Sequence, residues 1–484
     1  MTEIELKFQV PAQRVEALAR AMATPSATRV PLRATYFDTE DRRLVAAGLA
    51  LRVRSEGRRW VQTLKGAGDG IWQRLEHEVP RQVAPGTQPL ADPALHDGTT
   101  AGDALRRALG DDGVLKPIYG TQVTRTQRLL RGRGCVVELA FDRGALVAGK
   151  ERWPLCELEF ELKGGDPAAL VALAARWVQR FDLTLDTRTK AERGDRLARG
   201  QRLGAPVKAG ALELPEDIDC DTALRRIVGN CLQQVLGNAS DLAHEDGTIP
   251  EHLHQLRVGL RRLRTALREL GSLSPGVPAE WSEGLSTLFG RLGSARDRDA
   301  LAQTLLPALR KAGAGDLQLP VIEAEPAAQL ALRERATTGL WLQLVAFAAG
   351  SAASDQAFAP AAQQRLARLF KQVRRDAARF GALDDEARHR LRKRVKRLRY
   401  LSEFVATLFR DKRVLGFLKR LTPAQEALGA FNDICVARAL FKDVAGGDPM
   451  AMFALGWLAH EREDAIARCI KSLARLRRVE PFWT

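Results

Sequence analysis

Charged and apolar side chains alternate in two short segments of the sequence. Glu3, Glu5 and Lys7 are separated by single apolar residues, and the same pattern returns at Glu159 and Glu161. In a β-strand, side chains at positions i, i+2 and i+4 point to the same face of the sheet. Each segment therefore predicts a strand that carries its carboxylates together on one face.

Basic residues follow the same rule, since Arg52 and Arg54 also alternate with apolar residues. Two interpretations are open. In the first, an antiparallel sheet exposes a solvated face on which cross-strand ion pairs form. In the second, the strands close into a barrel whose lumen is lined by carboxylates and bases, because interior and exterior residues alternate along every barrel strand.

A lumen with both kinds of charge suits a metal-bound polyphosphate. Carboxylates bind hard divalent cations such as Mg²⁺, and arginine and lysine bind the remaining phosphate oxygens. This arrangement permits phosphoryl transfer to water, which depends on positioning and charge stabilisation. The sequence contains no GxxxxGK[ST] motif, which disfavours a Walker-type NTPase. It also contains no GxSxG or HExxH motif, which disfavours the hydrolases that carry those motifs.

In the C-terminal half, basic residues and a histidine recur at helical spacing. At 100° per residue, each of two sets falls on one stripe of a helix. The sets are His254, Arg257, Arg261 and Arg264, and His389, Arg392, Lys396 and Arg399. Such stripes are unstable unless an anion or a partner helix compensates them, and phosphate oxygens suit guanidinium groups. With only three tyrosines in the chain, base stacking has little support, so we expect a phosphate ligand and no nucleic acid.

The elements that must position these residues divide the chain into two parts. Up to about Gly200, short alternating runs are separated by glycine-rich turns, which predicts a β-rich domain. From about Asp221, long segments with apolar residues at three and four spacing predict helices. Between them, Gly204-Ala205-Pro206 and Leu214-Pro215 interrupt both patterns. We therefore predict a domain over 1–200, a linker over 201–217 and a helical domain over 218–484.

The helical part contains an internal repeat. The segment His254–Arg264 resembles His389–Arg399, and Leu292–Asp297 resembles Leu428–Asp433 in the same order. Two related helical bundles are expected, with copies near 221–345 and 360–480. The predicted fold class is α+β, with an N-terminal antiparallel β-barrel tunnel followed by an all-α domain of two repeated bundles.

Composition limits the partners and the cellular location. The 484 residues include 75 Lys and Arg against 59 Asp and Glu, a net charge of +16 that indicates a polyanionic partner. The six cysteines form no CxxC pair, so neither a disulfide scaffold nor a zinc site is predicted. No segment has the roughly 18 to 20 uninterrupted apolar residues of a membrane span, and the first residues lack a signal-peptide pattern. We expect a cytoplasmic protein with no membrane partner.

The N-terminal motifs resemble the CYTH superfamily, the triphosphate tunnel metalloenzymes. Glu3-Ile4-Glu5-Leu6-Lys7 matches the ExExK signature of that family. Further blocks agree in order over residues 1 to 200. They are Tyr36–Thr39, Leu51–Arg54, Thr63–Lys65, Arg74–Glu76, Glu138–Asp142, Glu159–Leu162 and Lys190–Gly194.

The resemblance implies an antiparallel tunnel barrel that holds a triphosphate with Mg²⁺ or Mn²⁺ as cofactor. The implied metal ligands are Glu3, Glu5, Glu159 and Glu161. The implied triphosphate-binding residues are Lys7, Arg52, Arg54, Lys65, Arg125 and Lys190. Asp142 would help to hold the metal or order the attacking water, and with Glu3, Glu5 and Lys7 it forms the implied catalytic set.

For several neighbouring residues the sequence leaves two roles open. Glu76 and Glu78 serve the site or neutralise an arginine in its wall. Glu157 shares the face of Glu159 but lies outside the aligned ExE pair. Arg193 binds phosphate or is a charge at a helix end, and Arg74 serves the tunnel or its rim.

The C-terminal half resembles the CHAD domain, the conserved histidine α-helical domain, over about residues 218 to 480. The resemblance implies that inorganic polyphosphate binds along both basic stripes, through the eight residues named above. Asp297, Asp299 and Asp433 are expected to be structural partners of the repeat arginines. Asn432 stands in the second copy where Arg296 stands in the first, so the two halves need not bind equally.

Together these features predict a metal-dependent inorganic triphosphatase that hydrolyses tripolyphosphate to pyrophosphate and phosphate, with a polyphosphate-binding helical domain. We expect it in the cytoplasm, associated with polyphosphate. The alternatives are an adenylate cyclase or a thiamine triphosphatase on the same tunnel, or a non-catalytic polyphosphate-binding protein. The oligomeric state and the preferred metal stay open at this point.

Overall fold

The computed structural model describes residues 2–57, 59–67, 73–84, 87–244, 250–293, 301, 305–315, 317–319, 328–351, 354–446 and 448–484. It contains two compact units. The first unit comprises residues 1–208, 232–255 and 329–350, and the second comprises 209–231, 256–328 and 351–484. Each unit therefore combines segments that are distant in the sequence.

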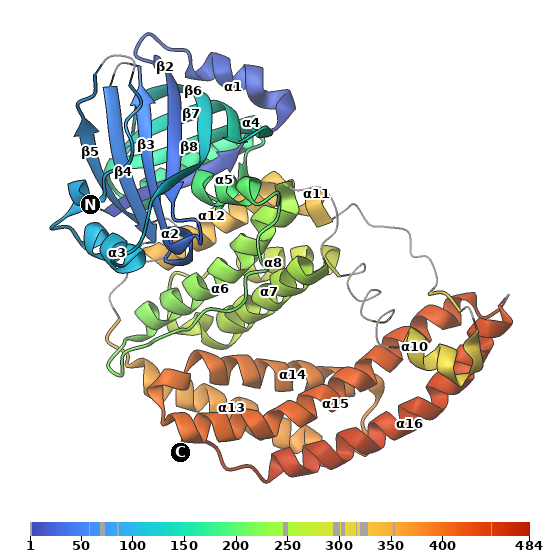
Figure 1. Cartoon of the computed structure of the whole chain (residues 1–484). Helices are drawn as coiled ribbons and strands as arrows, with labels where there is room; N and C mark the ends of the chain where they lie inside the picture. Colours follow the sequence, from blue (N-terminus) through green and yellow to red (C-terminus); the bar gives the residue numbers. More distant parts are fainter. Residues whose placement is uncertain are drawn as a thin grey trace. The chain divides into compact units, whose positions relative to one another are not determined.

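A nine-stranded antiparallel sheet forms the centre of the first unit (Figure 1). The strand order is β5-β4-β3-β2-β6-β7-β8-β1-β9, and a further pairing joins Thr2–Ile4 of β1 to Gln73–Leu75 of β5. The strands are β1 (Thr2–Gln9), β2 (Thr28–Asp38), β3 (Leu49–Glu56), β4 (Arg59–Ala67), β5 (Gln73–Arg81), β6 (Lys116–Gly132), β7 (Cys135–Ala148), β8 (Glu151–Gly165) and β9 (Thr184–Leu185).

An antiparallel sheet followed by helices confirms the predicted α+β class. The closed barrel stays a prediction, because β5 and β9 end the strand order and, among the described residues, three residue pairs link β5 to β1.

The predicted alternation positions the core of the first unit. On β8, Leu158 and Phe160 are buried on one face while the glutamates point to the other. Phe160 packs edge-on against Phe8 of β1 and against Trp177, with ring centroids 5.5 and 5.9 Å apart. Trp177 belongs to α4 (Pro167–Phe181), which contacts β7 and β8 (Figure 1). The apolar face of these strands is thus covered, and the charged face is left for the site.

Further helices complete the first unit. Besides α4 they are α1 (Val15–Met22), α2 (Arg43–Ala46), α3 (Thr100–Leu109), α5 (Lys190–Ala198), α11 (Ala328–Arg333) and α12 (Arg335–Ala349). Two long helices, α6 (Cys220–His244) and α7 (Pro250–Leu270), contribute residues 232–244 and 250–255 to this unit and their other residues to the second. Of these elements, α5 matters most for the site. Thr189 caps it in a capping box with Glu192, which satisfies its first backbone N–H groups.

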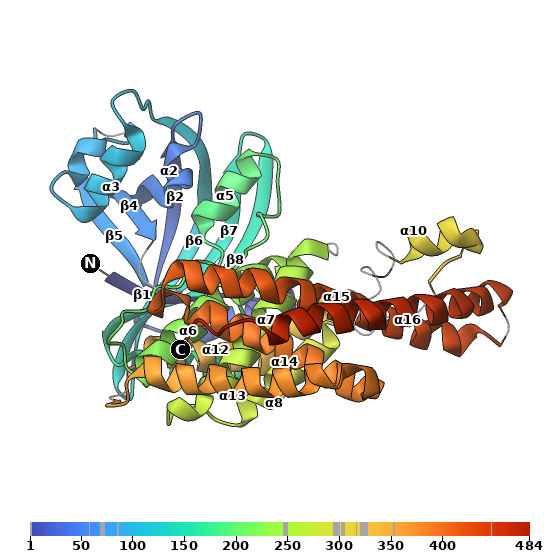
Figure 2. The same ribbon diagram turned by 90° about the horizontal axis from the view of Figure 1, so that it is seen from below.

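The second unit is helical. Apart from its shares of α6 and α7, it contains α8 (Glu280–Arg291), α10 (Leu306–Leu309), α13 (Phe358–Ala378), α14 (Asp385–Phe404), α15 (Asp411–Val444) and α16 (Pro449–Arg477). The last two helices run side by side (Figures 1 and 2). The two basic stripes lie on α7 and α14, as their spacing predicts. Among the described helices none combines the length and the apolar composition that a membrane span requires.

Candidate active site

The charged face of the sheet lines a cavity of about 1430 Å³ in the first unit. Most residues predicted to bind metal or triphosphate contribute to its wall. These are Glu5, Lys7, Arg52, Arg54, Lys65, Arg125, Glu159, Glu161 and Lys190. Asp142 is fully buried and contacts two of them. The side chains of Glu3 and Arg74 lie outside the described residues.

Strand register explains why these side chains meet. Glu5 of β1 pairs with Glu161 of β8, and Glu161 pairs with Glu138 of β7. Two residues further along the strands, Lys7 pairs with Glu159. Directly paired antiparallel residues have side chains on the same face, with Cβ atoms about 5 Å apart. Register therefore sets three carboxylates in one row across three strands, with a lysine and a glutamate in the next row.

Arg125 and Lys190 connect the carboxylates deeper in the cavity. Arg125 makes a bidentate contact with Asp142, at 2.8 and 2.7 Å, and a third contact with Glu159 at 2.7 Å. The ammonium of Lys190 lies 2.9 Å from Asp142 and 2.5 Å from both Glu157 and Glu159. Planar guanidinium and compact ammonium groups thus share the same acids, which gives a tightly coupled charged network.

The network keeps its members ionised. Burial raises the pKa values of Asp142 and Glu159, but the positive charges of Lys190 and Arg125 outweigh this effect and hold both pKa values below their usual range. Burial lowers the pKa of Lys190, whereas Asp142, Glu157 and Glu159 raise it well above its usual value. Because each group needs its partners to stay charged, removal of one cation leaves buried carboxylates uncompensated.

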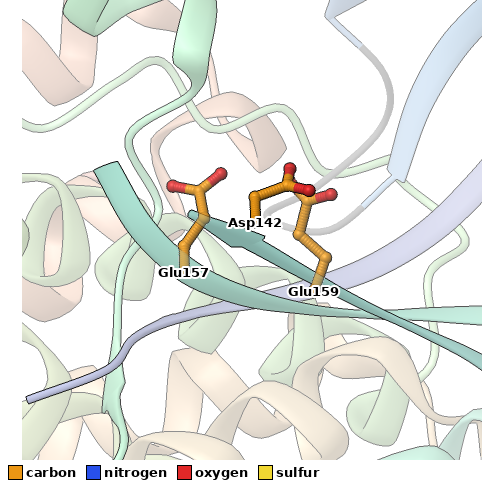
Figure 3. A group of neighbouring side chains, drawn as sticks. All are labelled: Asp142, Glu157 and Glu159. Carbon is orange, nitrogen blue, oxygen red and sulfur yellow. The ribbon is translucent and has the colours of Figure 1, made fainter. Parts of the chain in front are cut away.

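Three of these carboxylates form a group that could hold a metal ion. One oxygen each from Asp142 of β7 and from Glu157 and Glu159 of β8 lie within 4.8 Å of one another (Figure 3). Carboxylate oxygens are the donors that Mg²⁺ and Mn²⁺ prefer, so the donor set fits such a cation. The grouping overlaps the predicted metal ligands at Glu159. Glu5 and Glu161 line the same cavity in the adjacent row.

A basic wall forms another part of the cavity. Burial lowers the pKa of Arg54, and the nearby charges of Arg52 and Arg125 lower it further. Clustered cations of this kind are stabilised by a bound anion. Arg54 also contacts Glu78 at 3.8 Å, and Lys65 contacts Glu76 at 3.0 Å. These contacts support the neutralising role that the sequence left open for the two glutamates.

Glu157 and Arg193, whose roles the sequence left open, belong to the same network of ion pairs as Lys190. Glu157 is completely buried and forms ion pairs with Lys190 and Arg193. Arg193 is itself buried and lies on α5, one helical turn after Lys190. The signal was present in the spacing, because Glu157 shares the strand face of Glu159, and Lys190 and Arg193 are three positions apart on one face of a helix.

In the second unit, basic residues from both stripes gather. Burial lowers the pKa of Lys396 on α14 to about 7, and Arg392, Arg261 and Arg257 lower it too, whereas Asp433 raises it. We call Arg257, Arg261, Arg392 and Lys396 the helical basic cluster. Its residues come from α7 and α14, so the two repeat copies contribute to one positive region.

The remaining stripe residues have separate surroundings. The guanidinium groups of Arg257, Arg261 and Arg264 lie 5.0 to 5.8 Å from the ring centroid of Phe289. His389 is 3.0 Å from Asn432, and Arg399 is 2.7 Å from Glu403. His254 belongs to the first unit, and Arg296, Asp297 and Asp299 lie outside the described residues. Asp433 is near Lys396, in agreement with its expected role as a partner of basic residues.

Comparisons with known proteins agree with both motif sets. The family model of the CYTH domain matches residues 1–194, and that of the CHAD domain matches residues 226–442. An inorganic triphosphatase from Haemophilus influenzae is 30% identical over 168 residues, which cover 33% of this chain and 44% of that protein. The chain thus spans less than half the length of that relative.

Two solved structures are also similar. A CHAD domain from the plant Ricinus communis is 30% identical with a TM-score of 0.45, and the alignment covers 56% of this chain and 97% of that chain. A Hippeastrum protein, whose structure is described as revealing a dominant triphosphatase activity, is 18% identical with a TM-score of 0.31. That alignment covers 42% of this chain and 97% of the other. The two family matches thus identify a CYTH domain at residues 1–194 followed by a CHAD domain at residues 226–442.

Proposed function

We propose that the protein is a metal-dependent inorganic triphosphatase that hydrolyses tripolyphosphate to pyrophosphate and phosphate in the cavity of the first unit. The observation that carries this proposal is one cavity whose lining combines carboxylates, with Glu159 of the candidate metal group among them, and a basic wall. The CYTH match and the similarity to the Haemophilus influenzae enzyme support it. The pairing between β1 and β5 is consistent with a closed tunnel, which we include in the proposal.

In the proposed mechanism, the residues of the cavity bind and orient the substrate. Arg52, Arg54 and Lys65 bind phosphate oxygens and neutralise the charge that accumulates on the leaving pyrophosphate. Arg125 and Lys190 hold the carboxylates in their ionised form and keep them in place. Such preorganised charges lower the barrier of phosphoryl transfer without a covalent intermediate.

The metal would be held by carboxylates on β1 and β8. We propose Glu3, Glu5, Glu159 and Glu161 as its ligands, with Asp142 beside them to order the attacking water. When bound, Mg²⁺ or Mn²⁺ supplies Lewis-acid polarisation of a phosphoryl oxygen. Lys7, which pairs with Glu159 across β1 and β8, is proposed to bind the substrate phosphates.

For the helical region, over the proposed domain 218–484, we propose binding of inorganic polyphosphate at the two stripes. The helical basic cluster supports this, because crowding that lowers the pKa of Lys396 to about 7 is relieved by a bound polyanion. This binding would associate the protein with polyphosphate in the cytoplasm.

A substrate panel tests the proposed activity. Phosphate release is measured from tripolyphosphate, ATP, thiamine triphosphate and long-chain polyphosphate, each with Mg²⁺, with Mn²⁺ and with a chelator. We expect metal-dependent release with a strong preference for tripolyphosphate. Preference for thiamine triphosphate, or conversion of ATP to cyclic AMP, would replace the proposal by an alternative enzyme on the same tunnel. Polyphosphate binding without hydrolysis of any substrate would contradict catalysis.

A further inference from the structure

The turn that precedes α5 holds two lysines of the cavity. The backbone carbonyl of Arg188 accepts a hydrogen bond from the ammonium of Lys7, and Lys190 is the first residue of α5. Asp186 shapes this turn, because its carboxylate accepts hydrogen bonds from the backbone N–H of Arg188 at 2.9 Å and from the Nε of Arg188 at 3.0 Å. The positions of both lysines therefore depend on the conformation of residues 186–190.

The C-terminal end of α6 contacts this turn and the helix that follows it. Asp241 Oδ1 lies 3.5 Å from Nη1 of Arg188 and 2.7 Å from Nη1 of Arg196. These arginines stand on either side of Lys190, one just before α5 and one near its end. One carboxylate thus bridges the two ends of the helix that presents the lysine.

A neutral contact from the same end of α6 reinforces the ionic one. The hydroxyl of Ser240 accepts a hydrogen bond from the backbone N–H of Thr187 at 3.0 Å and lies 3.1 Å from the Thr187 hydroxyl. Thr187 itself lines the cavity. Two adjacent residues of α6 therefore hold two adjacent residues of the turn.

The ion pairs of Asp241 are buried, so loss of its charge is not compensated by water. The side chains of Arg188 and Asp241 are only 4% and 2% exposed. Asp241 Oδ2 also lies 3.6 Å from Nε2 of the buried His252. If the carboxylate of Asp241 is neutralised, Arg188 and Arg196 lose their shared counter-charge in a place where water has little access.

The helix α5 cannot set its own position. It has nine residues, and isolated helices shorter than about 12 residues are marginal in water, so tertiary contacts decide where it lies. Small displacements of such a helix move its first residue relative to the carboxylates on β7 and β8. The distances from Lys190 to Asp142, Glu157 and Glu159 therefore depend on the tertiary contacts that hold α5 in place.

We propose that Asp241 is a positioning residue that sets Lys190 and Lys7 in the cavity by clamping the 186–190 turn and α5. Asp241 lies within the residues that match the CHAD family model, whereas both lysines lie within the CYTH match. The consequence for hydrolysis rests on the proposed function. The structural consequence, a looser turn and a more accessible Lys190, does not.

The test compares Asp241→Asn with Asp182→Asn in the full-length chain. Asp182 also bridges two arginines of the first unit, Arg14 and Arg335, but it touches neither lysine. It is a suitable control because its backbone has a φ of 53°, which asparagine tolerates. Thermal unfolding first establishes that both variants are folded.

Two measurements then report on the turn without any substrate. They are the rate at which an amine-reactive reagent labels Lys190, with exposed Lys150 as internal reference, and amide hydrogen exchange over 186–198. We expect Asp241→Asn to raise both at least fivefold and Asp182→Asn to leave both within twofold of the wild type. Unchanged labelling and exchange in Asp241→Asn, or an equal rise in Asp182→Asn, would overturn the proposal.

Kinetics measure the consequence for the reaction. With tripolyphosphate, we expect Asp241→Asn to lower kcat/KM about tenfold, mainly through kcat, and Asp182→Asn to change it less than twofold. If Asp241→Asn does not fold, Ser240→Ala replaces it, with a smaller rise in labelling and exchange expected and no rise counting against the proposal. A wild-type protein without triphosphatase activity would refute the proposed function, whereas the labelling and exchange would still decide the role of Asp241.

Discussion

The cavity of the first unit and the helical basic cluster of the second unit are both rich in cationic side chains, but the charges that surround those side chains differ. In the cavity, Lys190 alone contacts three carboxylates, and Arg125 contacts two. In the helical cluster, Lys396 is surrounded mainly by arginines, and burial with this repulsion lowers its pKa to about 7. Mixed charges suit a metal-bound substrate and its chemistry, whereas crowded like charges suit the binding of a polyanion.

The largest effect is expected from a substitution of Lys190, which should affect hydrolysis in the cavity and leave polyphosphate binding by the helical basic cluster intact. Lys190→Met removes the ammonium that Asp142, Glu157 and Glu159 share, so we expect tripolyphosphate hydrolysis to fall at least about 100-fold, as for loss of a preorganised charge in an active site. Polyphosphate binding through the helical cluster should stay within twofold. Initial rates and a polyphosphate binding assay measure the two effects. Lys150→Met, at an exposed position, is the matched control.

If Lys190→Met retained more than a tenth of the wild-type rate while folded, the coupled network would not be part of the catalytic machinery.

A substitution of Lys396 in the helical basic cluster should have the opposite selectivity to Lys190→Met. Lys396→Gln removes a cation that a bound polyanion would recruit, so we expect the affinity for long-chain polyphosphate to fall about tenfold at pH 6.5. The kcat for tripolyphosphate should not change. Fluorescence anisotropy with a labelled polyphosphate measures the affinity, and Lys412→Gln, at an exposed site on α15, controls for the simple loss of one charge. Equal weakening in both variants would show that binding follows net charge and not the cluster.

The pH dependence of polyphosphate binding is a second test of the contribution of Lys396. The pKa of Lys396 in the free protein is about 7, and a bound polyanion raises it, so binding takes up a proton above pH 7. We expect the affinity to fall about tenfold from pH 6 to pH 8 at constant ionic strength, and to fall much less in Lys396→Gln. His389, whose pKa is lowered by burial and by Lys393, contributes only at lower pH. An affinity that rises with pH would contradict this assignment.

The smallest expected effect concerns the two roles left open for Glu76. Glu76 contacts Lys65 at 3.0 Å, so Glu76→Gln should leave Lys65 freer to bind phosphate and change the KM for tripolyphosphate only two- to threefold. The metal concentration that gives half-maximal rate should stay the same. A shift of tenfold or more in that metal requirement would instead identify Glu76 as a metal ligand. Glu78→Gln, which changes a neighbouring partner of Arg54, provides the comparison.

Much of the site could be predicted because its elements are strands with strict alternation. The ExExK segment and the Arg52–Arg54 pair predict which side chains share a face, and Glu5, Lys7, Arg52 and Arg54 line one cavity. The roles of Glu157 and Arg193 could not be ranked in this way. Alternation indicates the face of a strand, but the depth of a residue within a cavity depends on which helix covers that end of the sheet.

The sequence by itself determined the α+β class, the two families and the residue types that face the cavity, because these follow from local periodicity and from motifs. Only the tertiary structure decided that Lys190 joins Asp142, Glu157 and Glu159, and that Asp241 of α6 holds the turn beside it. These contacts connect residues tens of positions apart. Their partners are selected by burial and charge compensation in the folded chain, and no local pattern records that selection.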